Sequence, residues 1–309
     1  YKGYINNGSL QDKVKSNHYQ QPESGNYCIL DFSNDFVLYH DDCRSFPLYM
    51  GKDFVTNHPT IGGQQVYFDA SAVHKNNNFI YQHTASSKYR YNDSDLNFEQ
   101  VVNALCEYLI NTVEKFETDL PIYTTFTGGM DSTLVNSAFD YVGKAYTEHQ
   151  ITESCAISHW AYNQLPVTNM PQLQLTGFYG DTVLMRNPVM VNTLLSVHNI
   201  DLKKLYINSN GYTKPVYEKK YRKQMHLSSK FDKVEDARRQ VHNQMVNNFE
   251  IWHYNNCVTF TPFKNNHLIH TMLNADADTL VKQCLNAEVS RASIKRLNPN
   301  NLARINKNK

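Results

Sequence analysis

The stretch of this sequence best suited to chemistry is Thr-Gly-Gly-Met-Asp-Ser-Thr at residues 127–133, here called the first loop. Apolar and β-branched residues precede it at 121–126, and apolar side chains at helical spacing follow it to residue 142. The pattern predicts a strand, a glycine turn and a helix over 133–142. In that geometry, backbone N–H groups of the turn and the positive end of the helix point at one spot and form an anion site.

The residue types of the first loop suit a phosphate group. Two glycines let the main chain approach phosphate oxygens closely, the hydroxyl groups add donors, and the carboxylate can hold a metal ion. A Walker A loop is excluded because no Gly-Lys-Ser/Thr follows. An ordinary tight turn is the alternative for the glycines alone, but the flanking strand and helix favour a nucleotide site. The expected contacts are Thr127, Gly128, Gly129, Asp131, Ser132 and Thr133.

A second loop, Thr-Gly-Phe-Tyr-Gly-Asp-Thr at residues 176–182, also follows a predicted strand (172–176) and precedes a helix. Because the carboxyl ends of parallel strands meet at one edge of a sheet, Asp131 and Asp181 are expected to face one nucleotide, with Gly180 beside it. Two carboxylates near a triphosphate can hold magnesium, which offsets phosphate charge and assists the departure of pyrophosphate. Gly-Asp after a strand is also a common turn.

The first loop resembles the pyrophosphate-binding loop, Ser-Gly-Gly-x-Asp-Ser, of the ATP pyrophosphatase superfamily, whose members split ATP between the α- and β-phosphates. Together with the second loop, it resembles the synthetase domain of the asparagine synthetase family, which has Ser-Gly-x-Gly-x-Asp-Glu downstream. Residues 176–182 match that second motif without a gap. Residues 261–268 resemble the family's Pro-Phe-Leu-Asp stretch, and residues 41–49 resemble an Asp-x-x-Gly-x-x-Pro-Leu-Tyr stretch late in its glutaminase domain.

The resemblance implies ATP and Mg²⁺ as ligands, with Asp131 and Asp181 holding the metal. It implies adenylation of a small-molecule carboxylate, release of pyrophosphate and attack by an amine, which is an AMP-forming amide ligation. Residues 298–307 resemble the segment that ends in the lysine thought to steady the reacting phosphate, so Lys307 is the matching catalytic residue. Because termini fray, Lys309 or Lys295 are alternatives for this cation.

The departures from the family pattern also carry expectations. The family's glutaminase half begins with a nucleophilic cysteine, which is absent here, so glutamine hydrolysis is not expected unless a missing N-terminus supplies it. The expected assemblies are a homo-oligomer or a complex with a protein partner that supplies ammonia. Phe178 stands where asparagine synthetases carry Glu, so the general base is absent at its usual place, and Thr182 replaces a Glu. The short spacing between the loops predicts a reduced substrate lid. The alternatives to an amide ligase are a degenerate nucleotide-binding scaffold or assembly protein, and a viral relative that modifies nucleic acids or nucleobases.

Composition narrows the class of protein. The chain has 309 residues, 41% hydrophobic residues and a net charge of +1, so general attraction to nucleic acid is not expected. No apolar run reaches the length of a membrane span. Six cysteines without a C-x-x-C pair argue against zinc and suit a reduced, cytoplasmic location. His267 and His270 lack an H-E-x-x-H pattern, and His159-Trp160 and Trp252-His253 suit packing rather than metal binding.

The predicted fold is α/β, with a mostly parallel sheet and flanking helices of the adenine nucleotide α-hydrolase type, preceded by a small antiparallel β layer. Residues 1–92 are expected to form a truncated glutaminase-like β region, in which 1–25 are a loop or arm. Residues 93–309 are expected to form the ATP-pyrophosphatase synthetase domain. The strands predicted in the first region are 27–30, 36–39, 46–50, 65–68 and 79–81. The elements predicted in the second are a helix over 93–117 capped by Asp93 or Ser94, a strand at 144–146, a helix over 151–165 and mostly helix from 188 onward.

Overall fold

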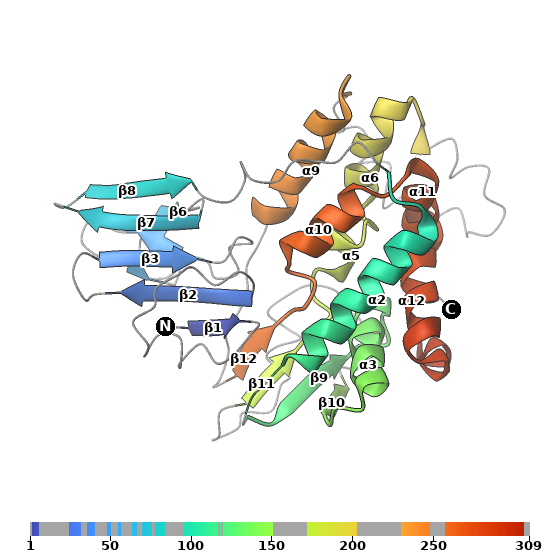
Figure 1. Cartoon of the computed structure of the whole chain (residues 1–309), viewed down its shortest axis with the longest axis horizontal. Coiled ribbons are helices and arrows are strands. Elements are labelled where there is room, and N and C mark those ends of the chain that lie inside the picture. The colour runs from blue at the N-terminus through green and yellow to red at the C-terminus, as the bar shows by residue number, and fades with distance from the viewer. Residues whose placement is uncertain are drawn as a thin grey trace.

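The computed structural model describes residues 2–5, 25–31, 36–40, 48–50, 55–56, 64–66, 70–75, 78–83, 95–116, 118, 120–150, 172–202, 230–247 and 257–305. The N-terminal strands pair antiparallel in two sheets, ordered β1-β2-β3-β7-β8 and β5-β4-β6 (Figure 1). They are β1 (Lys2–Ile5), β2 (Gly25–Asp31), β3 (Phe36–His40), β4 (Leu48–Met50), β5 (Val55–Thr56), β6 (Gln64–Val66), β7 (Ala70–Lys75) and β8 (Asn78–His83).

The predicted antiparallel layer is confirmed, and its five predicted strands are present as β2, β3, β4, β6 and β8. The prediction that residues 1–25 are a loop or arm is wrong for Lys2–Ile5, which pair antiparallel with Gly25–Cys28. β7 was not predicted either, because its small residues have low strand propensity. β1 forms through pairing with the distant β2, and β7 forms through pairing with β3 and with its neighbour in sequence, β8, rather than through an apolar pattern of its own.

A second, wholly parallel sheet has the order β10-β9-β11-β12. Its strands are β9 (Ile122–Phe126), β10 (Thr147–Gln150), β11 (Gln172–Leu175) and β12 (Cys257–Phe260). The α/β class and the mostly parallel sheet are therefore confirmed. The boundary between residues 92 and 93 stays a prediction.

Helices pack against this sheet and against one another (Figure 1). Phe116, just after the first long helix, stacks on Phe260 of β12 with ring centroids 5.7 Å apart. The helices are α2 (Phe98–Glu114), α3 (Met130–Val142), α5 (Gly180–Val183), α6 (Pro188–Leu195), α9 (Val234–Asn247), α10 (Asn266–Leu273), α11 (Ala277–Asn286) and α12 (Glu288–Leu297), with 3₁₀ turns η2 (Ser196–His198) and η3 (Pro299–Arg304). None of the helices in the described ranges is long and apolar enough to cross a membrane.

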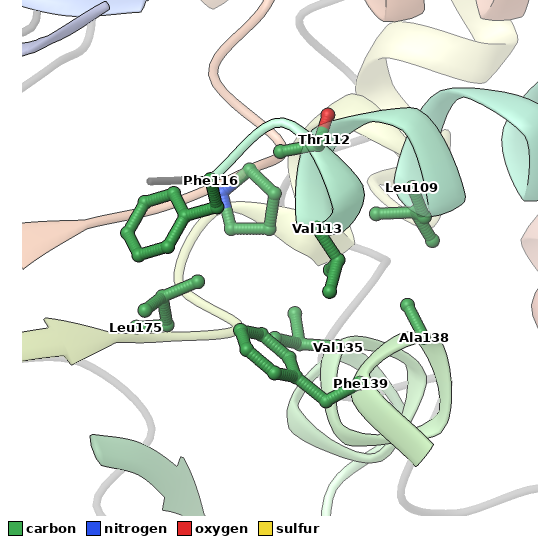
Figure 2. Close-up of a pocket in the computed structure, with 9 residues that line it drawn as sticks. Leu109, Thr112, Val113, Phe116, Val135, Ala138, Phe139 and Leu175 are labelled. Atoms are coloured by element: carbon green, nitrogen blue, oxygen red, sulfur yellow. The ribbon is translucent and has the colours of Figure 1, made fainter. Parts of the chain in front are cut away.

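A small internal pocket lies where α2, α3 and β11 meet, lined by Leu109, Val135, Phe139 and Leu175 among others (Figure 2). Thr112 is the one hydroxyl-bearing side chain in its lining, and that hydroxyl donates to the carbonyl of Tyr108 at 2.8 Å. A lining without available polar groups offers nothing to orient a nucleotide. The pocket therefore belongs to the core.

Three elements differ from the sequence predictions. α2 begins at Phe98 rather than near residue 93, because Asn97 and Gln100 form a reciprocal capping box. The strand predicted at 144–146 is instead β10, Thr147–Gln150. Lys144 holds the intervening connection, since its Nζ donates to the carbonyls of Val113 (2.9 Å) and Phe116 at the end of α2.

The third correction is β12, which lies in the region predicted to be mostly helical. A short apolar run buried in a parallel sheet does not alternate, so periodicity does not separate it from buried helix. The helix predicted over 151–165 lies outside the described residues.

Candidate functional site

The first loop has the strand–turn–helix geometry that the sequence predicts. β9 ends at Phe126 and α3 begins at Met130. Gly128 has a φ of 67°, a left-handed conformation that favours glycine. Gly129 is the N-cap and has no side chain to cap the helix. Because the helix starts three residues earlier than predicted, Asp131 lies in its first turn, where a negative charge is favoured.

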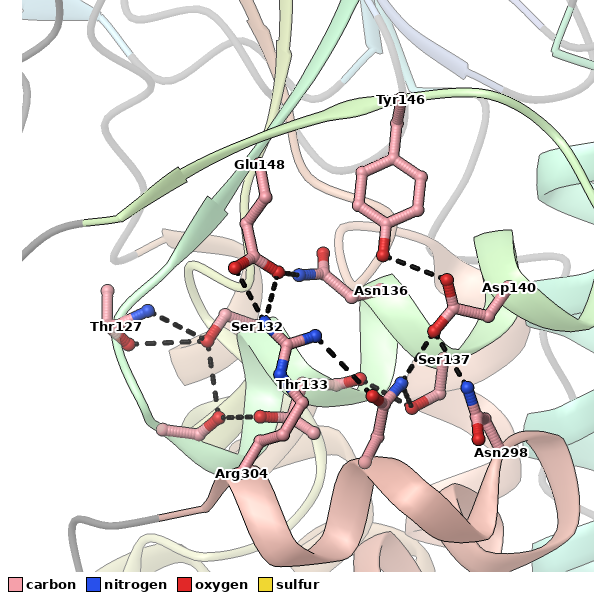
Figure 3. Close-up of polar contacts among 12 residues, drawn as sticks. Thr127, Ser132, Thr133, Asn136, Ser137, Asp140, Tyr146, Glu148, Asn298 and Arg304 are labelled. Atoms are coloured by element: carbon pink, nitrogen blue, oxygen red, sulfur yellow. Dashed lines mark hydrogen bonds and ion pairs between the residues drawn. The ribbon is translucent and has the colours of Figure 1, made fainter.

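The hydroxyl groups of the first loop bond within the loop (Figure 3). Ser132 Oγ and Thr133 Oγ1 donate to the carbonyl of Gly129 at 3.2 and 2.7 Å, and the Thr127 amide donates to Ser132 Oγ at 3.4 Å. Ser132 and Thr133 are buried, whereas Thr127 is partly exposed. The two buried hydroxyls therefore hold the turn in shape from inside, and Thr127 lies at its accessible edge.

The second loop follows β11, the parallel neighbour of β9, so the two loops lie at the same edge of the sheet. They touch. A Cβ atom added to Gly177 would lie 2.3 Å from the amide nitrogen of Ser132, and one added to Gly180 would lie 2.4 Å from Cγ of Asp131. The structure thus brings Gly180 against the Asp131 carboxylate, and the adjoining Asp181 is exposed.

The segment after β12, residues 261–268, supports the second loop. Thr261 Oγ1 donates to the carbonyl of Phe178 at 2.7 Å, and Tyr108 Oη donates to the carbonyl of Pro262 at 2.6 Å. Asn265 caps α10 by accepting from the amides of His267 and Leu268. These contacts connect the segments that follow β11 and β12 with each other and with α2 and α10.

Arg186 lies at the candidate site, and sequence reasoning missed it. Its Nη2 forms an ion pair with Oδ2 of Asp131, and the two side chains are 21% and 19% exposed. The partners are separated by 55 positions along the chain, and no local motif marks the arginine. Arg186 puts a cation directly at the carboxylate that the sequence assigns to a metal.

The C-terminal segment reaches the other side of the first loop, where η3 packs against α3. The Arg304 guanidinium lies 4.2 Å from the ring centroid of Phe126, the residue before the loop. Its Nη2 donates to both carboxylate oxygens of Glu148 at 2.6 Å, and Asn136 Nδ2 donates to one of them at 2.8 Å (Figure 3). Sequence reasoning missed this cation too.

The predicted Lys307 and its alternative Lys309 lie outside the described residues, and the other alternative, Lys295, lies exposed on α12. The segment that leads toward Lys307 is held on α3. Asp140 Oδ2 accepts from Asn298 Nδ2 at 2.9 Å and from Asn301 Nδ2 at 2.7 Å.

A group of three histidines, His242, His267 and His270, lies on α9 and α10. His267 and His270 lie on α10 as predicted, and the His270 ring centroid is 5.2 Å from that of His242. Burial, and then the charges of His242 and His267, lower the pKa of His270 to about 4. No group of three or more His, Cys, Asp or Glu side chains that could hold a metal occurs among the described residues.

Neither protein-family models nor curated proteins match this chain. The geometry of the two loops therefore carries the functional argument.

Proposed function

We propose that this chain is an ATP-dependent, AMP- and pyrophosphate-forming ligase that joins a carboxylate to an amine, as the asparagine synthetase family does. The observation that carries the proposal is the contact between the two glycine loops at the carboxyl edge of β9 and β11. There Gly180 lies against Asp131, and Gly177 lies against the amide of Ser132. Ligands of open parallel sheets bind at this edge.

Tyr179 supports the resemblance independently of the glycines. It stands at the second glycine of the family's Ser-Gly-x-Gly-x-Asp-Glu motif when residues 176–182 are aligned without a gap. Its φ is 67°, in the left-handed region that glycine adopts without strain. A tyrosine held in this conformation indicates that the surrounding structure requires the backbone shape that the motif's glycine would provide.

The site fits magnesium on the chemistry of its donors. Asp131 and Asp181 come from touching loops, and Mg²⁺ uses one or two protein carboxylates together with phosphate oxygens and water. When bound, the ion would offset phosphate charge and ease the departure of pyrophosphate.

The protein's own groups would orient the reactants. The amides at the start of α3 would bind the β- and γ-phosphates, leaving the α-phosphorus open to a carboxylate oxygen of the substrate. Attack breaks the bond to the β-phosphate oxygen, and pyrophosphate leaves with the electron pair. The amine nitrogen then attacks the acyl carbon, AMP leaves with the electron pair of the acyl–oxygen bond, and the surplus proton of the nitrogen passes to water or to the departing phosphate. Because Phe178 provides no base, the amine must arrive neutral, and Lys307 remains the proposed cation at the α-phosphate.

A nucleotide-binding scaffold is the second candidate, favoured by the ion pair between Arg186 and Asp131. Asp131, already paired with Arg186, would help to hold the two loops together even in a protein that is not an enzyme. Both a ligase and a scaffold would bind ATP, so only the formation of AMP and pyrophosphate distinguishes them.

The test is incubation of the purified protein with Mg-ATP and a panel of acids and amines, with AMP and pyrophosphate as readouts. Asp131→Asn is expected to weaken Mg-ATP binding by roughly tenfold or more, about 1.4 kcal/mol. Asp278→Asn, an exposed acid on α11, is the matched control and should change nothing. ATP recovered intact from the full panel would favour the scaffold, and undiminished binding by Asp131→Asn would move the site elsewhere.

A further inference from the structure

The ion pair between Arg186 and Asp131 lies at the centre of the candidate site rather than on an open surface. About four fifths of each side chain is shielded from solvent, and Gly180 covers the carboxylate on another side. In such surroundings two opposite charges attract more strongly than in bulk water. A carboxylate held in this way is a poor ligand for a metal ion, because the ion would have to displace a guanidinium and then lie beside it.

The backbone around Arg186 is fixed by the core. Met185, the residue before it, is fully buried and has a φ of 54°, a conformation that a non-glycine residue adopts only when its surroundings impose it. The carbonyl of Leu184 accepts from Nε2 of the buried Gln283 at 2.7 Å, and the Arg186 amide donates to the carbonyl of Asp181 at 2.8 Å. The main chain is therefore anchored, and the long side chain is the part that can change partner.

Arginine has a second favourable partner class at this position. Its planar fork of donors matches a phosphate group, and such pairs are among the strongest charge-assisted hydrogen bonds in proteins. The Nε of Arg186 is buried and has no hydrogen-bond acceptor among the described residues, so part of the fork is unused in the ion pair. A phosphate group could accept hydrogen bonds from both Nη2 and this unused Nε.

We propose that Arg186 is an exchanging cation that couples metal binding to nucleotide binding: it holds Asp131 when no phosphate is bound and transfers to a phosphate when one arrives, which frees Asp131 for the metal. This inference rests on the proposed function, since it assumes a nucleotide at the two loops. The divalent ion alone then binds poorly, and the ion and the triphosphate bind with positive coupling. Once pyrophosphate has left, Arg186 would pair with Asp131 again, and this carboxylate would no longer be available to hold a metal ion.

The experiment measures free Mn²⁺ by electron paramagnetic resonance and Mg-ATP binding by calorimetry, for the wild type and Arg186→Gln. The substitution is expected to tighten binding of Mn²⁺ alone by about tenfold or more and to weaken Mg-ATP binding by a similar factor. Arg239→Gln, which removes an exposed arginine on α9, is the control and should match the wild type. Thermal unfolding of each variant checks that it is folded.

A second variant keeps the test decisive if Arg186→Gln unfolds. Arg186→Lys retains the charge but not the fork, so it should exclude Mn²⁺ as the wild type does yet bind Mg-ATP less tightly. If the wild type binds Mg-ATP, the exchange is overturned when either folded variant keeps the wild-type Mg-ATP affinity, or when folded Arg186→Gln keeps the wild-type Mn²⁺ affinity. Wild-type protein that binds no nucleotide at all overturns the proposed function instead, whatever the Mn²⁺ result.

Discussion

At the scale of single residues, Gly177 and Gly180 have different neighbours. A methyl group on Gly177 would meet backbone atoms of Asp131 and Ser132, whereas one on Gly180 would meet the Asp131 side chain. Rotation of the Asp131 side chain can move its Oδ1, but its Cβ, 2.6 Å from the methyl group on Gly180, is fixed to the first turn of α3. That turn cannot move without disturbing the core beneath it.

We therefore expect different results from the two alanine variants. Gly177→Ala should lower the free energy of unfolding by about 1–3 kcal/mol through overpacking. Gly180→Ala should cost a similar amount, because Cβ of Asp131 cannot rotate away, and should in addition weaken Mg-ATP binding, because the Asp131 carboxylate is pushed off its position. Urea unfolding and calorimetry on both proteins provide the comparison, and neither glycine has a left-handed φ that would add backbone strain. A larger loss of Mg-ATP affinity in Gly177→Ala than in Gly180→Ala would contradict this account of the loop contact.

The sequence allowed the first loop to be predicted because its chemistry is local: glycines, hydroxyls and an acid within seven positions, between a strand and a helix. Arg186 could not be predicted in the same way. Its pairing with Asp131 depends on the fold, and its presentation depends on Met185 adopting a conformation that is rare for methionine. The spacing of residues along the sequence indicates neither the pairing of Arg186 nor the conformation of Met185.

At the scale of elements, the long helix α2 was predicted, whereas among four-residue strands β11 was predicted and β12 was missed. The apolar spacing of α2 identified the helix, although its start moved to the Asn97 capping box. The four residues of β12 were not recognised as a strand, because their assignment depends on pairing with Gln172–Leu175 in the finished sheet. The carboxyl edge of the parallel sheet was thus predicted from the first and second loops alone. The strand β12, whose following residue Thr261 contacts the second loop, was not part of that prediction.

The 3₁₀ turn η3 is expected to stabilise the first loop through Arg304. Arg304→Ala removes both the pair with Glu148 and the contact with Phe126. With the arginine 33% and the glutamate 18% exposed, solvent screening limits the expected loss to about 1–2 kcal/mol of unfolding free energy. Arg239→Ala removes a pair whose two side chains are each 62% exposed, and should cost less than about 0.5 kcal/mol. Denaturant titration of both variants is the measurement, and matching losses would show that Arg304 contributes only as a surface charge.

At the scale of the whole molecule, the site depends on segments from both ends of the helical and parallel-sheet region. Asn301 Nδ2 lies 3.0 Å from Ser137 Oγ and 2.7 Å from Asp140 Oδ2, which ties η3 to the helix that leaves the first loop. Arg304 binds β10 at the sheet edge, and Gln283 of α11 anchors the turn before Arg186. Loop geometry is therefore coupled to global packing, so conditions that loosen the helices should also weaken nucleotide binding.

Mild acid is such a condition, because the lowered pKa of His270 makes the free energy of unfolding depend on pH. Burial, with the charges of His242 and His267, lowers the pKa of His270 from 6.5 to about 4 in the folded protein. Between these values the unfolded chain binds a proton that the folded chain does not, so stability is fully present above about pH 6.5 and is lost as the pH falls toward 4. Because His270 is partly exposed, we expect a loss of about 1–2 kcal/mol rather than the full linkage value.

Urea unfolding of the wild type, His270→Gln and His267→Gln at several pH values between 4 and 7 tests this expectation. His270→Gln should flatten the fall in unfolding free energy, because the residue that takes up the proton on unfolding is gone. His267 lies exposed on the same helix, so its substitution should leave most of the fall in place. Mg-ATP affinity in the wild type should decline over the same pH range as stability and should be partly protected in His270→Gln. A wild-type slope that His270→Gln leaves intact would assign the acid sensitivity to groups other than His270.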